Sequence, residues 1–239
     1  MKRWRRRCDR PCPHDVPVKA CETLDARARR TLGSSHDAIY RMVNAALVAR
    51  GIEGGRLVDV GCGRGALWRV VSPLFDRYCG LDAVRYDGFP LCGEFRAVDL
   101  DAGDWPVADG EGDVVTAVET IEHLEDPWKF VRALVRIARP GGWVVITTPN
   151  QLSALSVLTL IVKRRFSAFQ DSLYPAHKTA LLESDLLRVA RAAGLEALAV
   201  AYSRLGRLPL ASAHYPAAIA RLLPRALSDN LLVIGRKPR

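Results

Sequence analysis

A short apolar run followed by three alternating glycines constrains the fold of this chain more than any other feature. Residues 56–66 read RLVDVGCGRGA, so Gly61, Gly63 and Gly65 lie between an apolar run and a helical pattern. Glycine adopts positive φ angles at little steric cost and lets other groups approach the backbone closely. In open parallel sheets, ligands bind at the carboxyl ends of the strands. The stretch therefore predicts a strand, a glycine turn and a helix beside a ligand crevice.

The rest of the chain repeats this alternation of apolar runs and amphipathic segments. Asp126 and Pro127 are typical of the first residues of a helix, which continues to about residue 138. Strands separated by helices predict an α/β fold with a parallel sheet that is covered on both faces. The predicted strands are 56–60, 77–82, 94–100, 112–118, 143–149, 195–203 and 230–237, and the other predicted helices are 35–50, 66–75 and 184–193.

The 239 residues suit one domain, which we expect to span 23–239. Much of the net charge of +9 lies in the first ten residues, so 1–22 is expected to be a flexible basic arm. Segments 150–176 and 204–229 lack clear periodicity and combine apolar with basic residues. We expect them to be insertions on the substrate side, with the helix 35–50 as a lid. They would either contact a membrane surface peripherally or simply cover the sheet edge.

No apolar run is long enough for a transmembrane segment, and no secretory signal follows the basic start, so a cytoplasmic protein is expected. An acid, Asp82, follows the glycine turn by about twenty residues, which is a suitable spacing for binding a ribose. Dinucleotide-binding turns carry G-x-G-x-x-G, whereas this chain has G-x-G-x-G with Ala66 next. The turn alone therefore leaves open whether the chain binds a dinucleotide or another cofactor that contains a ribose.

From about residue 35 to the end, the chain resembles the class I S-adenosylmethionine (SAM) dependent methyltransferases. The resemblance rests on VDVGCGRGAL, VDL, DVVTAVETIEHLEDP, RPGGWVVITTPN and HKTALLESDLLRVARAAGLE, with Leu182 departing from the helix-capping Thr or Ser of relatives. It implies a Rossmann-like fold, with a mostly parallel seven-stranded sheet, helices on both faces and an antiparallel last strand. It also implies SAM as cofactor. The cofactor-binding residues would be Asp59, Gly61, Gly63, Gly65, Asp82, Asp99, Leu100 and Glu119.

The segment AVETIEHLEDPW places Glu119, Glu122 and His123 just past the fourth strand, and we expect them to share one face of a helical turn. E-x-x-E-H resembles ubiquinone-biosynthesis O-methyltransferases and small-RNA 3′-terminal 2′-O-methyltransferases that hold a divalent ion here. By that resemblance, His177 would join the three residues around Mg²⁺, Mn²⁺ or Zn²⁺. Two alternatives stay open. Glu122 and His123 would be catalytic acid–base or substrate-contacting groups, or Glu122 would be solvated and His123 would only pack.

Methyl transfer from SAM requires alignment of the acceptor, and a hydroxyl acceptor must also lose a proton to a base or beside a metal. We expect O-methylation of a small or lipid-like apolar acceptor. An RNA 2′-O-methyltransferase is the main rival, and a non-catalytic SAM-binding module is the third hypothesis. No N-P-P-Y type sequence follows the fourth strand, which argues against N-methylation of nucleobases or glutamine.

Overall fold

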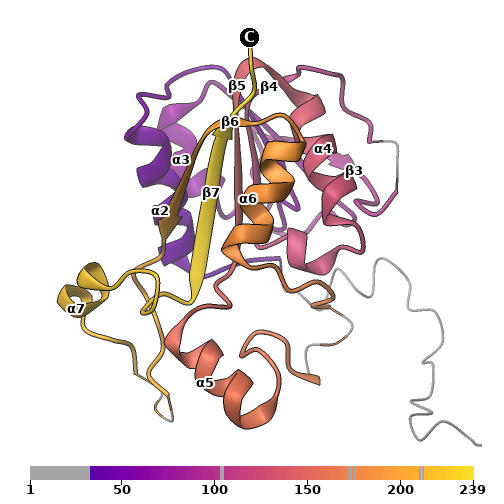
Figure 1. Ribbon diagram of the computed structural model, residues 1–239. Helices are drawn as coiled ribbons and strands as arrows, with labels where there is room; N and C mark the ends of the chain where they lie inside the picture. Colours follow the sequence, from indigo (N-terminus) through magenta and orange to yellow (C-terminus); the bar gives the residue numbers. More distant parts are fainter. Residues whose placement is uncertain (1–32, 103–104, 172–173, 175, 210, 212) are drawn as a thin grey trace, which may run out of the picture.

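The structure is a computed structural model that describes residues 33–102, 105–171, 174, 176–209, 211 and 213–239. The predicted basic arm, 1–22, lies outside these residues. One sheet forms the centre of the molecule, with the strand order β3-β2-β1-β4-β5-β7-β6 (Figure 1). Its strands are β1 (Arg56–Val60), β2 (Arg77–Asp82), β3 (Glu94–Ala97), β4 (Gly112–Val118), β5 (Ala138–Pro149), β6 (Glu196–Tyr202) and β7 (Asn230–Arg236).

The first five strands run parallel, and β7 runs antiparallel to both β5 and β6. This confirms the predicted Rossmann-like sheet, including the antiparallel last strand. Helices pack on both faces of the sheet (Figure 1). Those on the faces are α2 (Asp37–Val48), α3 (Trp68–Val71), α4 (Pro127–Ile137) and α6 (Glu183–Ala192), with 3-10 turns η1 (Ser72–Leu74) and η2 (Ile121–His123). Helices α5 (Ala154–Lys163) and α7 (Ala217–Leu222) lie beyond the carboxyl ends of the parallel strands (Figure 1).

The sheet separates two hydrophobic cores because successive side chains of a strand point to opposite faces. On β4, Val115 and Ala117 belong to the core beneath α4 and α6. Val114 and Val118 belong to the core beneath α2 and α3. A central strand buried on both faces is therefore apolar at nearly every position, as the run 112–118 is.

The helix ends follow local rules. Asp126 caps α4, its Oδ1 accepting a hydrogen bond of 2.9 Å from the Lys129 N–H, and Pro127 is the first helical residue as predicted. The side chain of Leu182, the N-cap of α6, cannot accept a hydrogen bond from the helix. However, Asp185 accepts a hydrogen bond of 3.3 Å from the Leu182 N–H. The departure from the Thr or Ser of relatives is thus compensated within the first turn.

Several predicted bounds need correction. The helix expected over 66–75 is reduced to α3 and the 3-10 turn η1, where Pro73 lacks a backbone N–H. The third strand ends at Ala97 instead of residue 100, and β5 begins at Ala138. The segments 150–176 and 204–229 are more regular than their sequences indicate, because they contain α5 and α7. Among the described residues, no helix combines the length and apolar character needed to cross a bilayer.

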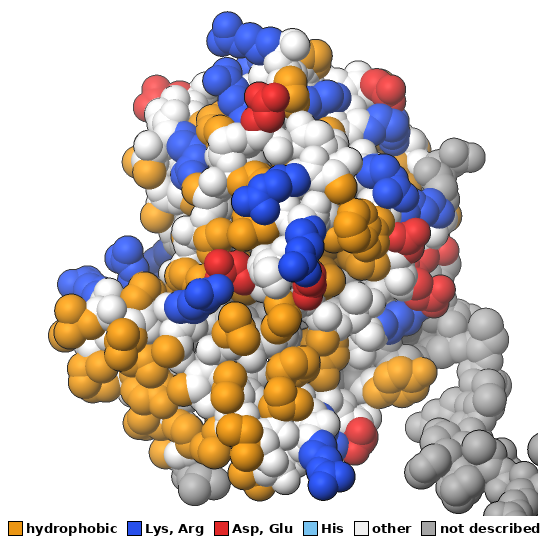
Figure 2. Space-filling model, viewed as in Figure 1, with side chains coloured by type: hydrophobic (Ala, Val, Ile, Leu, Met, Phe, Trp, Pro, Cys, Tyr) orange, Lys and Arg blue, Asp and Glu red, His pale blue; other side chains and the backbone are white. Residues whose placement is uncertain are grey.

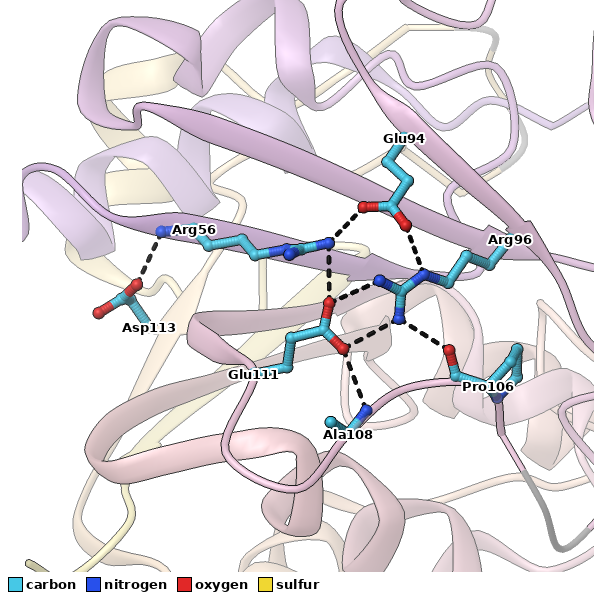
Figure 3. Close-up of polar contacts among 7 residues, drawn as sticks. All are labelled: Arg56, Glu94, Arg96, Pro106, Ala108, Glu111 and Asp113. Atoms are coloured by element: carbon cyan, nitrogen blue, oxygen red, sulfur yellow. Dashed lines mark hydrogen bonds and ion pairs between the residues drawn. The ribbon is translucent and has the colours of Figure 1, made fainter.

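At the amino ends of the strands, two arginines and two glutamates form one network (Figure 3). Arg56 contacts Glu94 and Glu111, with Nη2 2.8 Å from Glu111 Oε1. Arg96 donates hydrogen bonds to the same two carboxylates, from Nε to Glu94 Oε1 and from Nη2 to Glu111 Oε1, and both distances are 2.7 Å. Hydrogen bonds from Arg96 hold the pKa of Glu94 below its usual value. Burial would raise the pKa of Glu111, but its bonds from Arg96 outweigh this and lower it. The network therefore fastens β1, β3 and the start of β4 together.

Candidate functional site

A cavity of about 550 Å³ opens at the opposite edge of the sheet, beyond the carboxyl ends of β1, β2 and β4. It brings together segments that are far apart in sequence, from α2 to the start of β7. All but one of the predicted site residues line it. Those lining residues are Asp59, Gly61, Gly63, Asp82, Asp99, Leu100, Glu119, Glu122, His123 and His177.

The exception is Gly65, and the reason is steric. A Cβ on Gly65 would lie 2.4 Å from Pro90 Cδ, so this glycine makes room for the protein's own chain. The two cavity glycines have positive φ, +75° at Gly61 and +52° at Gly63. A Cβ on Gly63 would lie 2.2 Å from the carbonyl oxygen of Gly33. These positions therefore require glycine for close packing of the protein's own chain, whether or not a ligand is bound.

Two aspartates are held rigidly beside the glycine turn. Asp82 accepts hydrogen bonds from the N–H of Gly63 (2.8 Å) and of Ala83 (2.7 Å), which fixes its carboxylate at the end of β2. Burial raises its pKa. Asp59 accepts hydrogen bonds from the hydroxyls of Thr116 (2.7 Å) and Tyr78 (3.0 Å). Burial raises the pKa of Asp59 to about 6.

Asp99 and Leu100 line the cavity from a turn instead of a strand. Since β3 ends at Ala97, the chain turns here, and Asp99 Oδ1 accepts a hydrogen bond of 3.0 Å from the Asp101 N–H. The predicted residues thus reach the cavity, although the predicted strand does not extend to them.

Glu119 has an unexpected backbone and a fixed side chain. Its φ is +49°, in the left-handed region, so it does not belong to a helical turn with Glu122 and His123. Its Oε1 accepts a 2.8 Å hydrogen bond from the Thr147 hydroxyl, and its Oε2 accepts a 2.7 Å bond from the Asn230 amide. Burial and the neighbouring Glu122 raise its pKa well above the usual value. Glu119 is therefore directed toward β5 and β7.

Glu122 lies in the 3-10 turn η2 with a side chain that is buried. The expectation that it could be solvated is therefore wrong. Its Oε2 accepts a 3.2 Å hydrogen bond from the Thr148 hydroxyl. Burial raises its pKa to about 8. Its backbone carbonyl accepts hydrogen bonds from the N–H groups of Lys178 and Thr179, which brings the segment with His177 to the site.

His123 and His177 meet edge to face, with ring centroids 4.8 Å apart. Nδ1 of His123 lies 2.7 Å from the carbonyl oxygen of Ala176, and Nδ1 of His177 lies 2.6 Å from that of Ala168. Because a carbonyl oxygen only accepts, each Nδ1 carries a proton, which in the neutral ring leaves the lone pair on Nε2. Burial and the nearby His123 lower the pKa of His177, which favours its neutral form.

These two rings and Glu122 form a group that could hold a metal ion. One ligand atom from each of the three residues lies within 4.8 Å of the others. Hydrogen bonding of the second ring nitrogen to a carbonyl is typical of histidines that bind metals. The structure does not bring Glu119, the fourth predicted ligand, into this group. The donor set thus fits a divalent ion with three protein ligands.

Sequence reasoning missed several residues that line the cavity. His36 is the N-cap of α2 and Tyr40 lies in its first turn, and Arg207 and His214 come from the segment before α7. Asn230 begins β7 and bonds to Glu119 across 111 positions of sequence. No local pattern marks these residues, because only the tertiary fold brings them to the cavity. The polar run Ser34, Ser35 and His36 just before α2 is the one signal that could have identified His36.

Comparisons with known proteins agree with this geometry. A family described as a methyltransferase domain matches residues 35–200. The chain is similar to a ubiquinone biosynthesis O-methyltransferase of Thiobacillus denitrificans, with 34% identity over 157 residues, which are 61% of this chain and 66% of that protein. The match thus spans just under two thirds of the relative's length.

Two solved structures share the fold. One is a methyltransferase from Haloferax volcanii in complex with the activator Trm112, with a TM-score of 0.61, 22% identity, and coverage of 90% of this chain and 96% of that one. The other is a phosphoethanolamine N-methyltransferase of Haemonchus contortus in complex with S-adenosylhomocysteine, with a TM-score of 0.53, 16% identity, and coverage of 82% and 53%. From the matched domain, the strand order and the glycine turn together, we conclude that the chain belongs to the class I SAM-dependent methyltransferases.

Proposed function

We propose that this protein transfers the methyl group of SAM to an oxygen atom of a small or lipid-like apolar acceptor. One observation carries the proposal. A single cavity joins the glycine turn, Asp82 and Glu119 to the cluster of Glu122, His123 and His177. The first group suits the donor and the second suits removal of an acceptor proton, so donor and acceptor would meet within one enclosed space.

The acidic lining fits SAM because the donor carries positive sulfonium and ammonium groups. Asp82, which is fixed by two backbone N–H groups, would accept hydrogen bonds from the ribose hydroxyls. Asp99 and the Leu100 amide would meet the adenine, and Glu119 would face the methionine ammonium. Burial raises the pKa of both Asp82 and Glu119. A bound cation would favour the ionised carboxylates and lower those pKa values again.

The acceptor proton has two routes out within the cluster. His123 is held by Ala176 with its Nε2 bearing a lone pair, so it could act as a general base toward a hydroxyl. Alternatively, Glu122, His123 and His177 would hold a divalent ion (Mg²⁺, Mn²⁺ or Zn²⁺), which when bound lowers the pKa of a hydroxyl. Two nitrogen ligands and one oxygen ligand suit Zn²⁺ or Mn²⁺ better than Mg²⁺.

The acceptor class rests on two supports. The similar protein of Thiobacillus denitrificans is named as an O-methyltransferase. The segments that complete the cavity, 150–176 and 204–229, are rich in apolar residues. We also propose that α2 acts as a lid, since its first residues line the cavity.

A turnover screen tests the proposal. The full chain would be incubated with SAM labelled in the methyl group and with cell fractions of lipids, small metabolites and RNA, each with and without a chelator. We expect label in an apolar small molecule. Label in RNA alone would refute the apolar acceptor and support an RNA 2′-O-methyltransferase. SAM binding without label in any fraction would support the non-catalytic module. Loss of turnover on chelation, restored by Zn²⁺ or Mn²⁺, would select the metal route.

A further inference from the structure

Exposed apolar side chains gather on two helices outside the cavity. Of the twelve large hydrophobic residues exposed in the described part of the chain, eight lie on or directly beside α5 and α7. Figure 2 shows the resulting apolar region over these two helices, with basic side chains at its margins. We call it the α5–α7 surface. It consists of Val157, Leu158, Leu160, Ile161, Val162, Ile219, Leu222 and Leu223.

Both helices of this surface bury very little of their apolar side chains. Ser156 is the one buried residue of α5, while Ile161 is 73% and Val162 is 68% exposed. On α7, Leu222 is 79% exposed and Ala220 is the buried residue. Contiguous exposed apolar patches of this kind mark surfaces that bind a partner.

The charges around the surface indicate what that partner is. Segments 150–176 and 204–229 contain seven Lys or Arg residues, two Asp and no Glu. Both aspartates already pair with an arginine, Asp171 with Arg165 and Asp229 with Arg207. The surface is thus apolar with a basic border. In a symmetric contact between two copies, these basic residues would repel, whereas an anionic bilayer offers both apolar chains and negative headgroups.

The two segments that carry the surface also contribute residues to the cavity. Ser167 and Ala168, shortly after α5, line the cavity, and so do Arg207 and His214, shortly before α7. A bilayer held against the two helices would therefore lie beside the cavity opening.

We propose that the α5–α7 surface docks on an anionic lipid bilayer, so that the acceptor enters the cavity from the membrane. The entry of an acceptor rests on the proposed function, whereas the docking itself does not. The apolar side chains insert at the interface, and the long side chains of Lys163, Arg164 and Arg221, all exposed, reach the headgroups. This binding involves helices that lie on the membrane, not helices that span it.

Vesicle flotation of the full chain tests the docking. The vesicles would be phosphatidylcholine alone or an equimolar mixture with phosphatidylglycerol. The test variant is Ile161→Glu with Leu222→Glu, and the matched control is Val48→Glu with Leu91→Glu. The control adds the same charge at exposed apolar positions outside the surface. We expect the mixed vesicles to bind wild type and control alike, and the test variant at least tenfold more weakly.

Equal binding of the test variant and wild type would overturn the proposal, since it would assign vesicle binding to another part of the chain. Absence of wild-type binding, or a dimer in light scattering that the test variant abolishes, would overturn it as well. SAM affinity of the same samples separates this outcome from the proposed function. Vesicle binding without SAM binding would refute the methyltransferase proposal alone, and the reverse result would refute the docking alone.

Discussion

Acidic side chains play opposite roles at the amino and carboxyl ends of the parallel strands. At the amino edge, Glu94 and Glu111 lie between Arg56 and Arg96, and their pKa values are lowered (Figure 3). At the carboxyl edge, Asp59, Asp82, Glu119 and Glu122 line a cavity, and their pKa values are raised by burial. None of these four forms an ion pair with a described Lys or Arg.

This difference distinguishes carboxylates that stabilise the fold from carboxylates that belong to the functional site. Carboxylates that are neutralised by arginine stabilise the fold. Carboxylates that are desolvated without such a partner cost stability, and such groups cluster at functional sites. A cation, such as the sulfonium donor or a metal ion, would supply the missing charge at the carboxyl edge. Substitutions at the two ends should therefore change stability in opposite directions, and only those at the carboxyl ends should change activity.

The largest effect is expected for catalysis at the carboxyl edge. His123→Ala removes either the general base or a metal ligand, so turnover on the acceptor identified by the screen should fall at least 100-fold. SAM affinity should change less than threefold, because His123 belongs to the acceptor half of the cavity. Labelled-methyl assays and equilibrium titration would measure the two quantities. Turnover within threefold of wild type would show that the His123 side chain takes no part in the reaction.

The second prediction concerns stability and pH. The folded-state pKa of Glu122, about 8, is above its unfolded value, so the carboxyl group destabilises the fold increasingly as pH rises from about 4.5 to 8. Glu122→Gln removes this penalty. The variant should be more stable than wild type at pH 8 by an amount on the order of a few kcal/mol, with little difference at pH 4.5. Urea unfolding of the ligand-free protein at both pH values would measure this.

The matched substitution at the amino edge should have the opposite sign. Glu111→Gln removes the more buried of the two carboxylates that Arg56 and Arg96 share, and should cost about 1–2 kcal/mol at pH 7. The cost should disappear as pH falls, since the pKa of Glu111 is lowered in the fold and its stabilisation is lost on protonation. If Glu111→Gln and Glu122→Gln changed stability in the same direction at pH 8, the comparison of the two edges would fail.

The smallest effect is expected for Glu94→Gln. Its side chain is 48% exposed, so solvent screens its pairing with the two arginines. The free energy of unfolding should fall by about 0.5 kcal/mol or less, and turnover should be unchanged. A loss of several kcal/mol in urea unfolding would show that the network depends on Glu94 more than its exposure indicates.

Much of the fold could be predicted from sequence, because apolar runs and turn residues are local signals. The bounds of β2 and β4 match their predicted ranges, and Asp126 caps α4 as expected. The regularity of α5 could not be predicted from periodicity, since α5 is apolar around most of its surface.

The site was predictable where its residues follow strand ends, and less so elsewhere. Asp82 and Glu122 line the cavity because the carboxyl ends of parallel strands converge there. The left-handed backbone of Glu119 and its bond to Asn230 depend on β7, which is distant in sequence. The meeting of His123 with His177 was expected only from resemblance, because spacing alone does not bring them together.

If the cavity has a donor half and an acceptor half, titration of SAM distinguishes the residues of the two halves. Calorimetric titrations would compare wild type, Asp82→Asn and Glu122→Gln at pH 7.5. We expect SAM to bind wild type, Asp82→Asn to weaken binding about 10- to 100-fold by losing a charged hydrogen-bond partner, and Glu122→Gln to change it less than threefold. Absence of SAM binding to wild type, or equal weakening by both substitutions, would show that the cavity has no separate donor half.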